Sequence, residues 1–324
     1  MRSIHQLALC GLLTIAFSAT AYAQAYPSKP VRIVVPFPPG GGGDTIMRLF
    51  TEKLTAALGQ PIVVDNRGGA AGRLGSEYVA RAAPDGYTLL QGSPAAIVIA
   101  PALFPKLPYK SPGDFAAISL LAYDSQVLVV HPSVPARSIK ELIAFAKARP
   151  GQINFASSGP GDMNHLSAEL FDLQAGVNMI HVPYKGNAPG MLSVMTGETD
   201  LMFINIIPAL PQIKANKLRA LGVSSLKRSP ILPDVPTLAE SGLPGFAAVP
   251  FYAVLAPAGT PREIIQRLNQ EFVKALHSPD IQSRLTSYGL DIVGSTPDEL
   301  DAMITTDIGK WSKVIKQAHI KPPD

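Results

Sequence analysis

The stretch VRIVVPFPPGGGGD, residues 31–44, joins a short β-branched run to the start of an amphipathic segment. Apolar residues then recur at near-helical spacing as far as Leu58. The pattern predicts a strand, a glycine-rich turn and a helix that opens at Asp44. Glycines in such a turn let backbone N–H groups approach a ligand, and the N-terminus of the helix favours negative charge. The stretch therefore indicates an α/β fold with an anion-binding turn.

A nucleotide site and a tight turn without a ligand are two other interpretations of this turn. A nucleotide site is disfavoured, because no Gly-Lys-Ser/Thr ending follows and the spacing does not match a dinucleotide fingerprint. A tight turn without a ligand remains open, with Asp44 as the N-cap of the helix. We expect Asp44 to be a cap in either case, since an uncompensated carboxylate would repel a bound anion.

Strand and helix patterns continue to alternate along the chain. Short apolar runs at 62–64 and 88–90 complete a first set, and a second set begins at 127–130. This alternation predicts parallel sheets covered by helices. We expect the last third of the chain to rejoin the first set, with crossings near 123–126 and 249–252 that would form a hinge between two lobes. Two independent tandem domains are the alternative.

Two further loops follow predicted strands. NRGGAAG, residues 66–72, contains Arg67, for which bracing of the loop is favoured over pairing with a ligand carboxylate. ASSGPG, residues 156–161, leads to a helix bearing His165, and its serine hydroxyls and N–H groups suit carboxylate oxygens. Ordinary capping by a serine or by Asp162 is an equal alternative.

Sequence signs of catalysis or metal binding are weak. Neither His165 nor His181 has a partner at metal-ligand spacing, and the region around Ser157 and Ser158 lacks a Gly-x-Ser-x-Gly elbow. The only cysteine, Cys10, precedes the expected cleavage site described below. We therefore expect no enzyme activity, no catalytic residue, no metal and no cofactor, and a hydrolase is disfavoured.

The N-terminus predicts export. Arg2 precedes an apolar run over residues 7–17, and AYA at 21–23 offers a small-residue cleavage site, so residues 1–23 form a predicted signal peptide. The apolar run is too short to span a bilayer. A mature chain without cysteine suits a bacterial periplasm. The formal net charge is only +4 and basic runs are lacking, which disfavours a nucleic-acid partner.

Several segments, taken in order, resemble the extracytoplasmic solute receptors of the tripartite tricarboxylate transporter family, also called Bug proteins. The likeness runs through the whole chain after the predicted cleavage site. It is carried by YPSKPVRIVVPFPPGG at 26–41, VDNRGGAAG at 64–72, APDGYTL at 83–89, HVPYKG at 181–186, DVPT at 234–237 and APAGTP at 256–261.

The resemblance implies a periplasmic binding protein fold of the type II kind, in which two crossings join two lobes and the ligand lies in the cleft. Lobe 1 would comprise residues 24–125 and 251–324, and lobe 2 residues 126–250. The implied function is capture of a small organic carboxylate by a periplasmic monomer, which delivers it to the membrane permease subunits of a secondary transporter. A receptor that signals to a membrane sensor kinase is the alternative.

The resemblance also places the ligand-binding residues in loops at the cleft. Asn205 stands where the family often has an acidic residue, which disfavours an amino-acid ligand. The loop at 93–96 lacks the polar residues usual there, so we expect a carboxylate with a hydrophobic or aromatic body. The implied contacts are Phe37, Pro39, Gly40, Gly41, Ser93, Ser157, Ser158 and Gly159, with Lys185 and Asn205 as weaker candidates.

Overall fold

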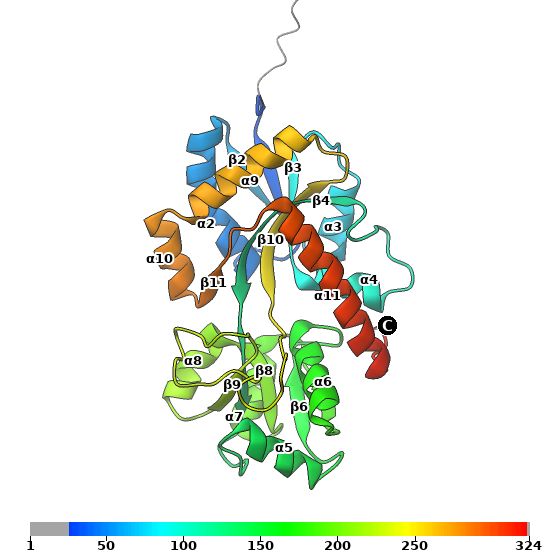
Figure 1. Ribbon diagram of the computed structural model, residues 1–324, viewed down its shortest axis with the longest axis vertical. Helices are drawn as coiled ribbons and strands as arrows, with labels where there is room; N and C mark the ends of the chain where they lie inside the picture. The colour runs from blue at the N-terminus through cyan, green and yellow to red at the C-terminus, as the bar shows by residue number, and fades with distance from the viewer. Residues whose placement is uncertain (1–25, 323–324) are drawn as a thin grey trace, which may run out of the picture.

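The computed structural model describes residues 26–322, so the predicted signal peptide at 1–23 lies outside the described part of the chain. Within residues 26–322 the chain forms two sheets, each flanked by helices and one above the other in Figure 1. We call the six-stranded sheet with its helices lobe 1 and the five-stranded sheet with its helices lobe 2. The predicted two-lobed α/β fold is confirmed.

Lobe 1 is built on a mixed sheet with the order β11-β4-β10-β3-β1-β2. Its strands are β1 (Val31–Val35), β2 (Ile62–Asn66), β3 (Thr88–Gly92), β4 (Phe115–Asp124), β10 (Phe251–Pro257) and β11 (Leu290–Ile292). β1 pairs in parallel with β2 and β3. β10 runs antiparallel to both β3 and β4, and β11 runs antiparallel to β4.

Lobe 2 has a mixed sheet in the order β7-β6-β8-β5-β9. Its strands are β5 (Gln126–Val130), β6 (Asn154–Ser157), β7 (Ile180–Pro183), β8 (Leu201–Asn205) and β9 (Arg219–Val223). β6 is parallel to β7 and β8, whereas β5 is antiparallel to β8 and β9. The ends of β6 and β8 therefore lie together at one edge of the sheet, which is where loops that bind ligands belong.

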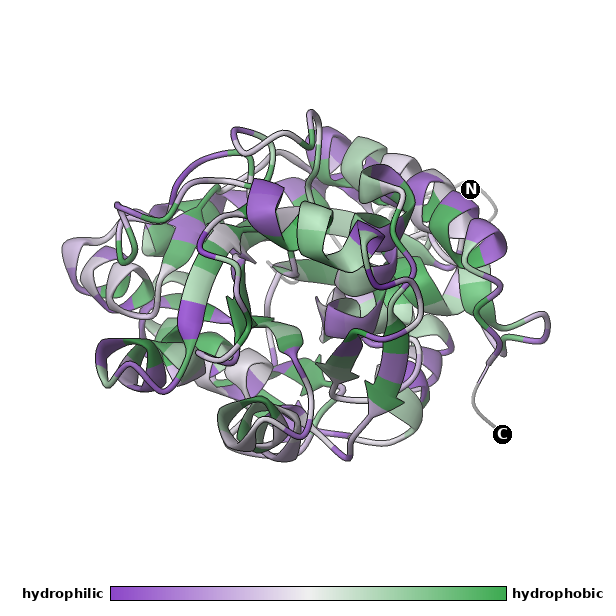
Figure 2. Cartoon of the chain, turned by 90° about the horizontal axis from the view of Figure 1, so that it is seen from below, coloured by the Kyte–Doolittle hydropathy of each residue, from purple (hydrophilic) through white to green (hydrophobic). Residues whose placement is uncertain are grey.

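Helices cover these sheets, and in Figure 2 many of them carry both hydrophilic and hydrophobic residues. They are α2 (Gly42–Leu58), η1 (Ala70–Gly72), α3 (Arg73–Ala80), η2 (Ala95–Ile99), α4 (Ala100–Leu103), α5 (Ile139–Lys147), α6 (Met163–Ala175), α7 (Asn187–Thr196), α8 (Ile206–Lys214), α9 (Arg262–Leu276), α10 (Pro279–Ser287) and α11 (Pro297–Gln317). Among the described residues, none of these helices combines the length and apolar character that crossing a membrane requires.

The chain passes between the lobes at two adjacent places. β4 ends at Asp124 in the sheet of lobe 1, and β5 begins at Gln126 in the sheet of lobe 2. After β9 and a proline-rich connector, the chain re-enters lobe 1 at Phe251. We propose the lobe boundaries expected from the sequence, 24–125 with 251–324 and 126–250, because the sheet membership of the strands changes at these points.

The expectation of purely parallel sheets is wrong. β10 and β5 are the strands next to the crossings, and each is antiparallel to its neighbours because the chain arrives there from the opposite lobe. The sequence patterns also gave no sign of β4, β11, α8 or α10. β4 is buried along nearly its whole length, so it lacks the alternation that marks a strand with one exposed face.

The C-terminal helix α11 ties the two lobes together. It begins with a capping box in which Thr296 and Glu299 bond reciprocally. It packs against β4, η2 and α4 of lobe 1 and against α6 of lobe 2, as Figure 1 shows. Trp311 on its inner face is buried at 2% exposure in the largest apolar core. The helix thus stabilises one arrangement of the lobes.

Burial disfavours the ionised form of Asp172, on α6. Its Oδ2 accepts a hydrogen bond from Met179 N–H (2.8 Å), but its buried Oδ1 has no partner among the described residues. Burial, reinforced by the charge of Glu169, raises the pKa of Asp172 to about 7. Because this pKa is higher in the folded than in the unfolded state, the free energy of unfolding is undiminished at low pH, where the carboxyl is protonated. It falls as the pH rises towards 7 and the buried carboxyl ionises.

We expect Asp172→Asn to be more stable than wild type at pH 8 by about 2 kcal/mol, with the gain falling towards zero at pH 4. The neutral amide keeps the acceptor for Met179 N–H and removes the buried charge. Urea unfolding at the two pH values measures the difference. Equal stability of variant and wild type at pH 8 would contradict this interpretation.

Candidate functional site

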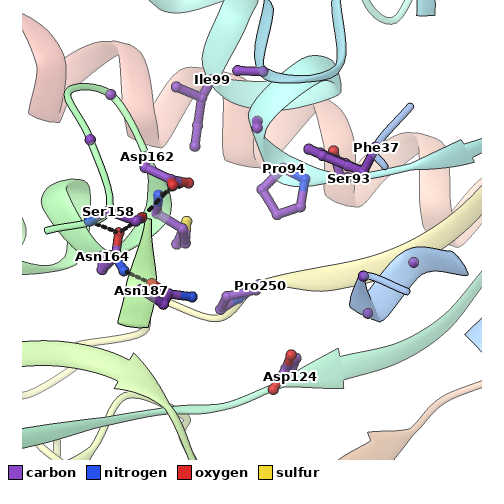
Figure 3. A pocket seen from close by; sticks show the side chains of 18 of the residues that line it. Phe37, Ser93, Pro94, Ile99, Asp124, Ser158, Asp162, Asn164, Asn187 and Pro250 are labelled. Carbon is purple, nitrogen blue, oxygen red and sulfur yellow. Dashed lines mark hydrogen bonds between the residues drawn. The ribbon is translucent and has the colours of Figure 1, made fainter. Parts of the chain in front are cut away.

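A cavity of about 840 Å³ lies between the lobes. The loop after β1 and the residues after β3 form its lobe 1 wall, and the loop after β6 forms its lobe 2 wall. Figure 3 shows the two walls facing each other, with Asp124 and Pro250 of the crossings below them. Since each wall follows the carboxyl end of a parallel strand, the cavity lies where open α/β sheets bind ligands.

The loop after β1 ends at Gly41, which is the N-cap of α2 (φ −73°, ψ 169°). The prediction that Asp44 is the N-cap is therefore wrong. Asp44 reaches back instead and accepts a hydrogen bond from Gly40 N–H (2.9 Å). Its other oxygen accepts a charge-assisted bond from Arg48 (2.9 Å), which lowers the pKa of Asp44. Its charge is thus compensated by Arg48, one turn further along α2.

This arrangement leaves an anion-attracting turn at the cavity wall. The N–H groups of Gly41, Gly42 and Gly43 find no acceptor in the described part of the chain. The partial positive charge of the α2 N-terminus adds to them, and the Asp44 carboxylate is held by Arg48 rather than left unpaired. The predicted anion-binding character of the turn therefore has a structural basis.

Of the four glycines at residues 40–43, Gly42 and Gly43 have the least space for a side chain, although neither is among the predicted contacts. A Cβ on Gly42 would overlap the Tyr252 hydroxyl, and a Cβ on Gly43 would overlap Oε1 of Gln91 and lie 3.0 Å from its Cδ. By contrast, a Cβ on Gly40 would meet nothing within 4 Å, and one on Gly41 only Pro38 O at 3.5 Å. Gly40 still needs glycine for its φ of +81°. The partners of Gly42 and Gly43 come from distant strands, which no local motif indicates.

Two buried polar atoms beside this turn lack partners. Ser93, expected to bind ligand, lines the cavity at 8% exposure, and its Oγ makes no hydrogen bond in the described structure. Gln91, which was not predicted, is 1% exposed; its Nε2 donates to Gly92 O (2.7 Å) while its Oε1 has no partner. Buried polar groups are normally paired, so both atoms favour a polar ligand at this wall.

The second glycine loop braces the same wall. Arg67 pairs with Asp65 (2.8 Å) and its guanidinium lies 3.8 Å from the centre of the Tyr78 ring, and it does not line the cavity. The predicted bracing role agrees with this geometry. Arg73 does line the cavity, but it donates to Ala70 O (2.9 Å) and stacks on Phe104.

The loop after β6 forms the lobe 2 wall through a network of side chains. The hydroxyl of Ser158 lies within hydrogen-bond distance of both Asp162 Oδ2 and Asn164 Oδ1 and donates its one proton to either of them, and Asn164 in turn donates to Asn187 Oδ1 (2.6 Å). Asp162 is also the N-cap of α6, where it accepts from Met163 N–H (2.9 Å). Figure 3 shows this network at one side of the cavity. Both expected roles of the loop, capping and lining, therefore occur together.

Ser157 lies behind this loop rather than in the cavity wall. It is fully buried at the end of β6, and its Oγ is 2.6 Å from His181 Nε2. The His181 and His165 rings stack with centroids 3.8 Å apart, and His165 Nδ1 accepts from Gly161 N–H (2.9 Å). Burial and the neighbouring His165 lower the pKa of His181 to about 3. His181 is thus neutral, and the stacked pair supports the loop structurally.

The remaining predicted residues divide in the same way. Phe37, Pro39, Gly159 and Asn205 line the cavity, whereas Lys185 is exposed and does not. No cluster of three or more metal-ligating side chains occurs within residues 26–322. An apolar patch, formed from both lobes, completes the wall and consists of Pro94, Ile99, Leu103, Phe104 and Met163.

The cavity floor is formed by the crossings and contains Asp124. Its Oδ2 accepts hydrogen bonds from Asn205 Nδ2 (2.7 Å) and from the Tyr252 hydroxyl (3.1 Å). Burial raises the pKa of Asp124 to about 6, so the carboxyl is mostly ionised at neutral pH. Because Asn205 belongs to lobe 2 and the other two to lobe 1, this cluster also links the lobes at the hinge.

Comparison with known proteins agrees with this geometry. The model of the tripartite tricarboxylate transporter family receptor matches residues 46–320. BugT of Bordetella pertussis is 38% identical over 324 residues, covering 99% of each chain.

Two solved structures of similar fold contain carboxylates. An R. palustris protein with adipate has a TM-score of 0.79 and 34% identity, over 92% of this chain and 100% of that one. MatC from Rhodopseudomonas palustris with bound malate has a TM-score of 0.75 and 34% identity, over 90% of this chain and 100% of that one. From its family match and its likeness to BugT, the chain belongs to the tripartite tricarboxylate transporter receptors, the Bug family of periplasmic solute-binding proteins.

Proposed function

We propose that this protein captures a small organic carboxylate between its lobes in the periplasm and delivers it to the permease subunits of a tripartite tricarboxylate-type transporter. The observation that carries the proposal is the free N–H groups at the start of α2 beside the unpaired Ser93 hydroxyl, opposite the lobe 2 loop across one cavity. Backbone N–H groups at a helix N-terminus bind carboxylates without a salt bridge. The adipate and malate of the two similar structures support this ligand class.

Binding would proceed in two steps. The acid first meets the turn at Gly41 in lobe 1, where charge-assisted hydrogen bonds hold its oxygens. Lobe 2 then rotates at the crossings and brings the loop containing Ser158 against the ligand. The ligand favours the closed form by its higher affinity for that form, and a permease can distinguish closed from open protein. No step makes or breaks a covalent bond in this scheme.

Direct ligand contacts are proposed for the predicted residues that line the cavity. These are Phe37, Pro39, Gly40, Gly41, Ser93, Ser158, Gly159 and Asn205. Ser157 would act through the loop that it supports. Lys185, which is exposed away from the cavity wall, is left out of the proposed contacts.

Uptake measurements test the delivery step. We expect a strain lacking the gene to lose uptake of the radiolabelled acid that stabilises the purified protein most, and expression of the wild-type chain to restore it. Uptake of an acid that does not stabilise the protein should be the same in both strains and serves as the control. Undiminished uptake in the deletion strain would contradict delivery to a permease.

A further inference from the structure

Asp124 has one carboxylate oxygen that accepts no hydrogen bond from the described part of the chain. Asn205 and Tyr252 both donate to Oδ2, while Oδ1 has no hydrogen-bond partner among residues 26–322. The residue lines the cavity floor, where Figure 3 shows its carboxylate below the two walls. The side chains that hold Asp124 therefore orient it and leave its second oxygen for another donor.

No cation of the described chain balances this charge. Asp124 takes part in none of the ion pairs found within residues 26–322. Arg73 is the one basic side chain that lines the cavity in this range, and it is occupied by Ala70 O and the Phe104 ring. Asp162 adds a second carboxylate to the lining. The cavity thus has more acidic than basic groups, which is unfavourable for a ligand that carries only negative charge.

A second acceptor points to the same chemistry. Gln91 lines the cavity, and its Oε1 is a buried acceptor without a donor beside Gly43; its orientation is fixed because Nε2 donates to Gly92 O. Gln91 and Tyr252 lie so close to Gly43 and Gly42, in the first turn of α2, that a Cβ on either glycine would overlap one of them. The unpaired acceptor and the Asp124 cluster therefore both adjoin the turn whose free N–H groups attract a carboxylate.

A ligand that satisfies all of these groups needs both an anionic and a donating end. From this juxtaposition we infer that the cavity selects amino carboxylates: the ligand carboxylate binds the N–H groups of the α2 turn, and its ammonium group binds Asp124 Oδ1. The inference rests on the proposed function and narrows its ligand class. The inference replaces the sequence-based expectation that Asn205 disfavours an amino-acid ligand. The carboxylate of Asp124, at the end of β4, takes the place of an acidic residue at position 205.

Two matched series of acids test the inference by isothermal titration calorimetry of the mature chain stripped of bound ligand. The first series is succinate, malate and aspartate, and the second is 3-phenylpropionate, 3-phenyllactate and phenylalanine. Within each series only the substituent next to one carboxylate changes, from hydrogen to hydroxyl to ammonium. We expect the amino member of the series that binds to have at least a 10-fold lower Kd than its unsubstituted parent.

Asp124→Asn assigns the effect to the proposed group. The amide retains an acceptor for Asn205 and Tyr252 but has no charge. The Kd of the parent acid should therefore exceed the Kd of its amino derivative by less than about 3-fold. Asp291→Asn is the matched control, since Asp291 accepts from Ser125 near the same hinge but does not line the cavity; its ratio should equal that of wild type.

The outcomes separate this inference from the function on which it rests. Parent acids that bind as tightly as their amino derivatives would overturn the inference and leave carboxylate capture intact. An unchanged ratio in Asp124→Asn would overturn the assigned role of Asp124. If none of the six acids binds to the wild-type chain, the result contradicts the inference, whereas the proposed function is contradicted only if no carboxylate of any class stabilises the protein.

Discussion

Replacing Gly43 with valine is expected to abolish measurable ligand binding, with a loss of affinity of at least about 100-fold, or roughly 2.7 kcal/mol. The new Cβ would overlap Gln91 Oε1 and lie 3.6 Å from Val35 Cγ1. Gln91 is almost fully buried and tied to Gly92 O, so it cannot move aside without disturbing the turn. The N–H groups of the turn would then no longer point at one anion.

Titration calorimetry with the best-binding acid measures the loss. Gly309→Val is the matched control: Gly309 lies in α11 on the exposed surface, and a Cβ there meets no atom within 4 Å. It should bind like wild type and unfold within about 0.5 kcal/mol of it. Circular dichroism should show both variants folded. Wild-type affinity in Gly43→Val would remove the α2 turn from the site.

Truncation of Trp311 to alanine is expected to destabilise the protein by about 3–5 kcal/mol. This side chain is buried at 2% exposure, on the helix that packs against both lobes. Its neighbour Lys310 donates to Ala247 O in the lobe 2 connector, so loosening α11 would also weaken the link between the lobes. Such a change should lower the thermal unfolding midpoint by about 8 °C.

Differential scanning calorimetry of the ligand-free protein tests this expectation. Leu226→Ala serves as the comparison, because Leu226 is 63% exposed and its truncation should alter stability by no more than about 0.5 kcal/mol. A thermal unfolding midpoint of Trp311→Ala within 1 °C of wild type would contradict the proposal that Trp311 stabilises the fold through α11.

Local patterns predicted the parts of this fold that depend on neighbours in sequence. The strand at Val31–Val35 follows from its β-branched residues, and the helix after the glycine-rich turn follows from the apolar spacing up to Leu58. The cavity walls after β1 and β6 were indicated by glycine and serine at strand-to-helix junctions. In these places the same few residues determine both the backbone conformation and the surface that it presents.

Features that depend on distant contacts were missed. Whether position 43 tolerates a side chain depends on Gln91, which lies on another strand. Ser157 and Ser158 are adjacent in sequence, yet one faces His181 and the other the cavity, and only the register of β6 distinguishes them.

The hinge cluster shows the same limit. It combines the ends of β4 and β8 with the start of β10, and no spacing in the sequence places Asp124 beside Asn205 and Tyr252. The crossings bring these residues together, so the charge at the cavity floor could be predicted only once the topology was known.

Ligand-induced thermal stabilisation tests carboxylate capture most directly. The mature chain, stripped of bound ligand by partial unfolding and dialysis, is scanned with aliphatic di- and tricarboxylates, aromatic carboxylates and amino acids. A ligand at a hundred times its Kd should stabilise the fold by about 2.7 kcal/mol, which raises the unfolding midpoint by several degrees. We predict such a rise with at least one carboxylate class and none with the matching alcohols or amides. No rise with any carboxylate would contradict the proposal that this cavity binds them.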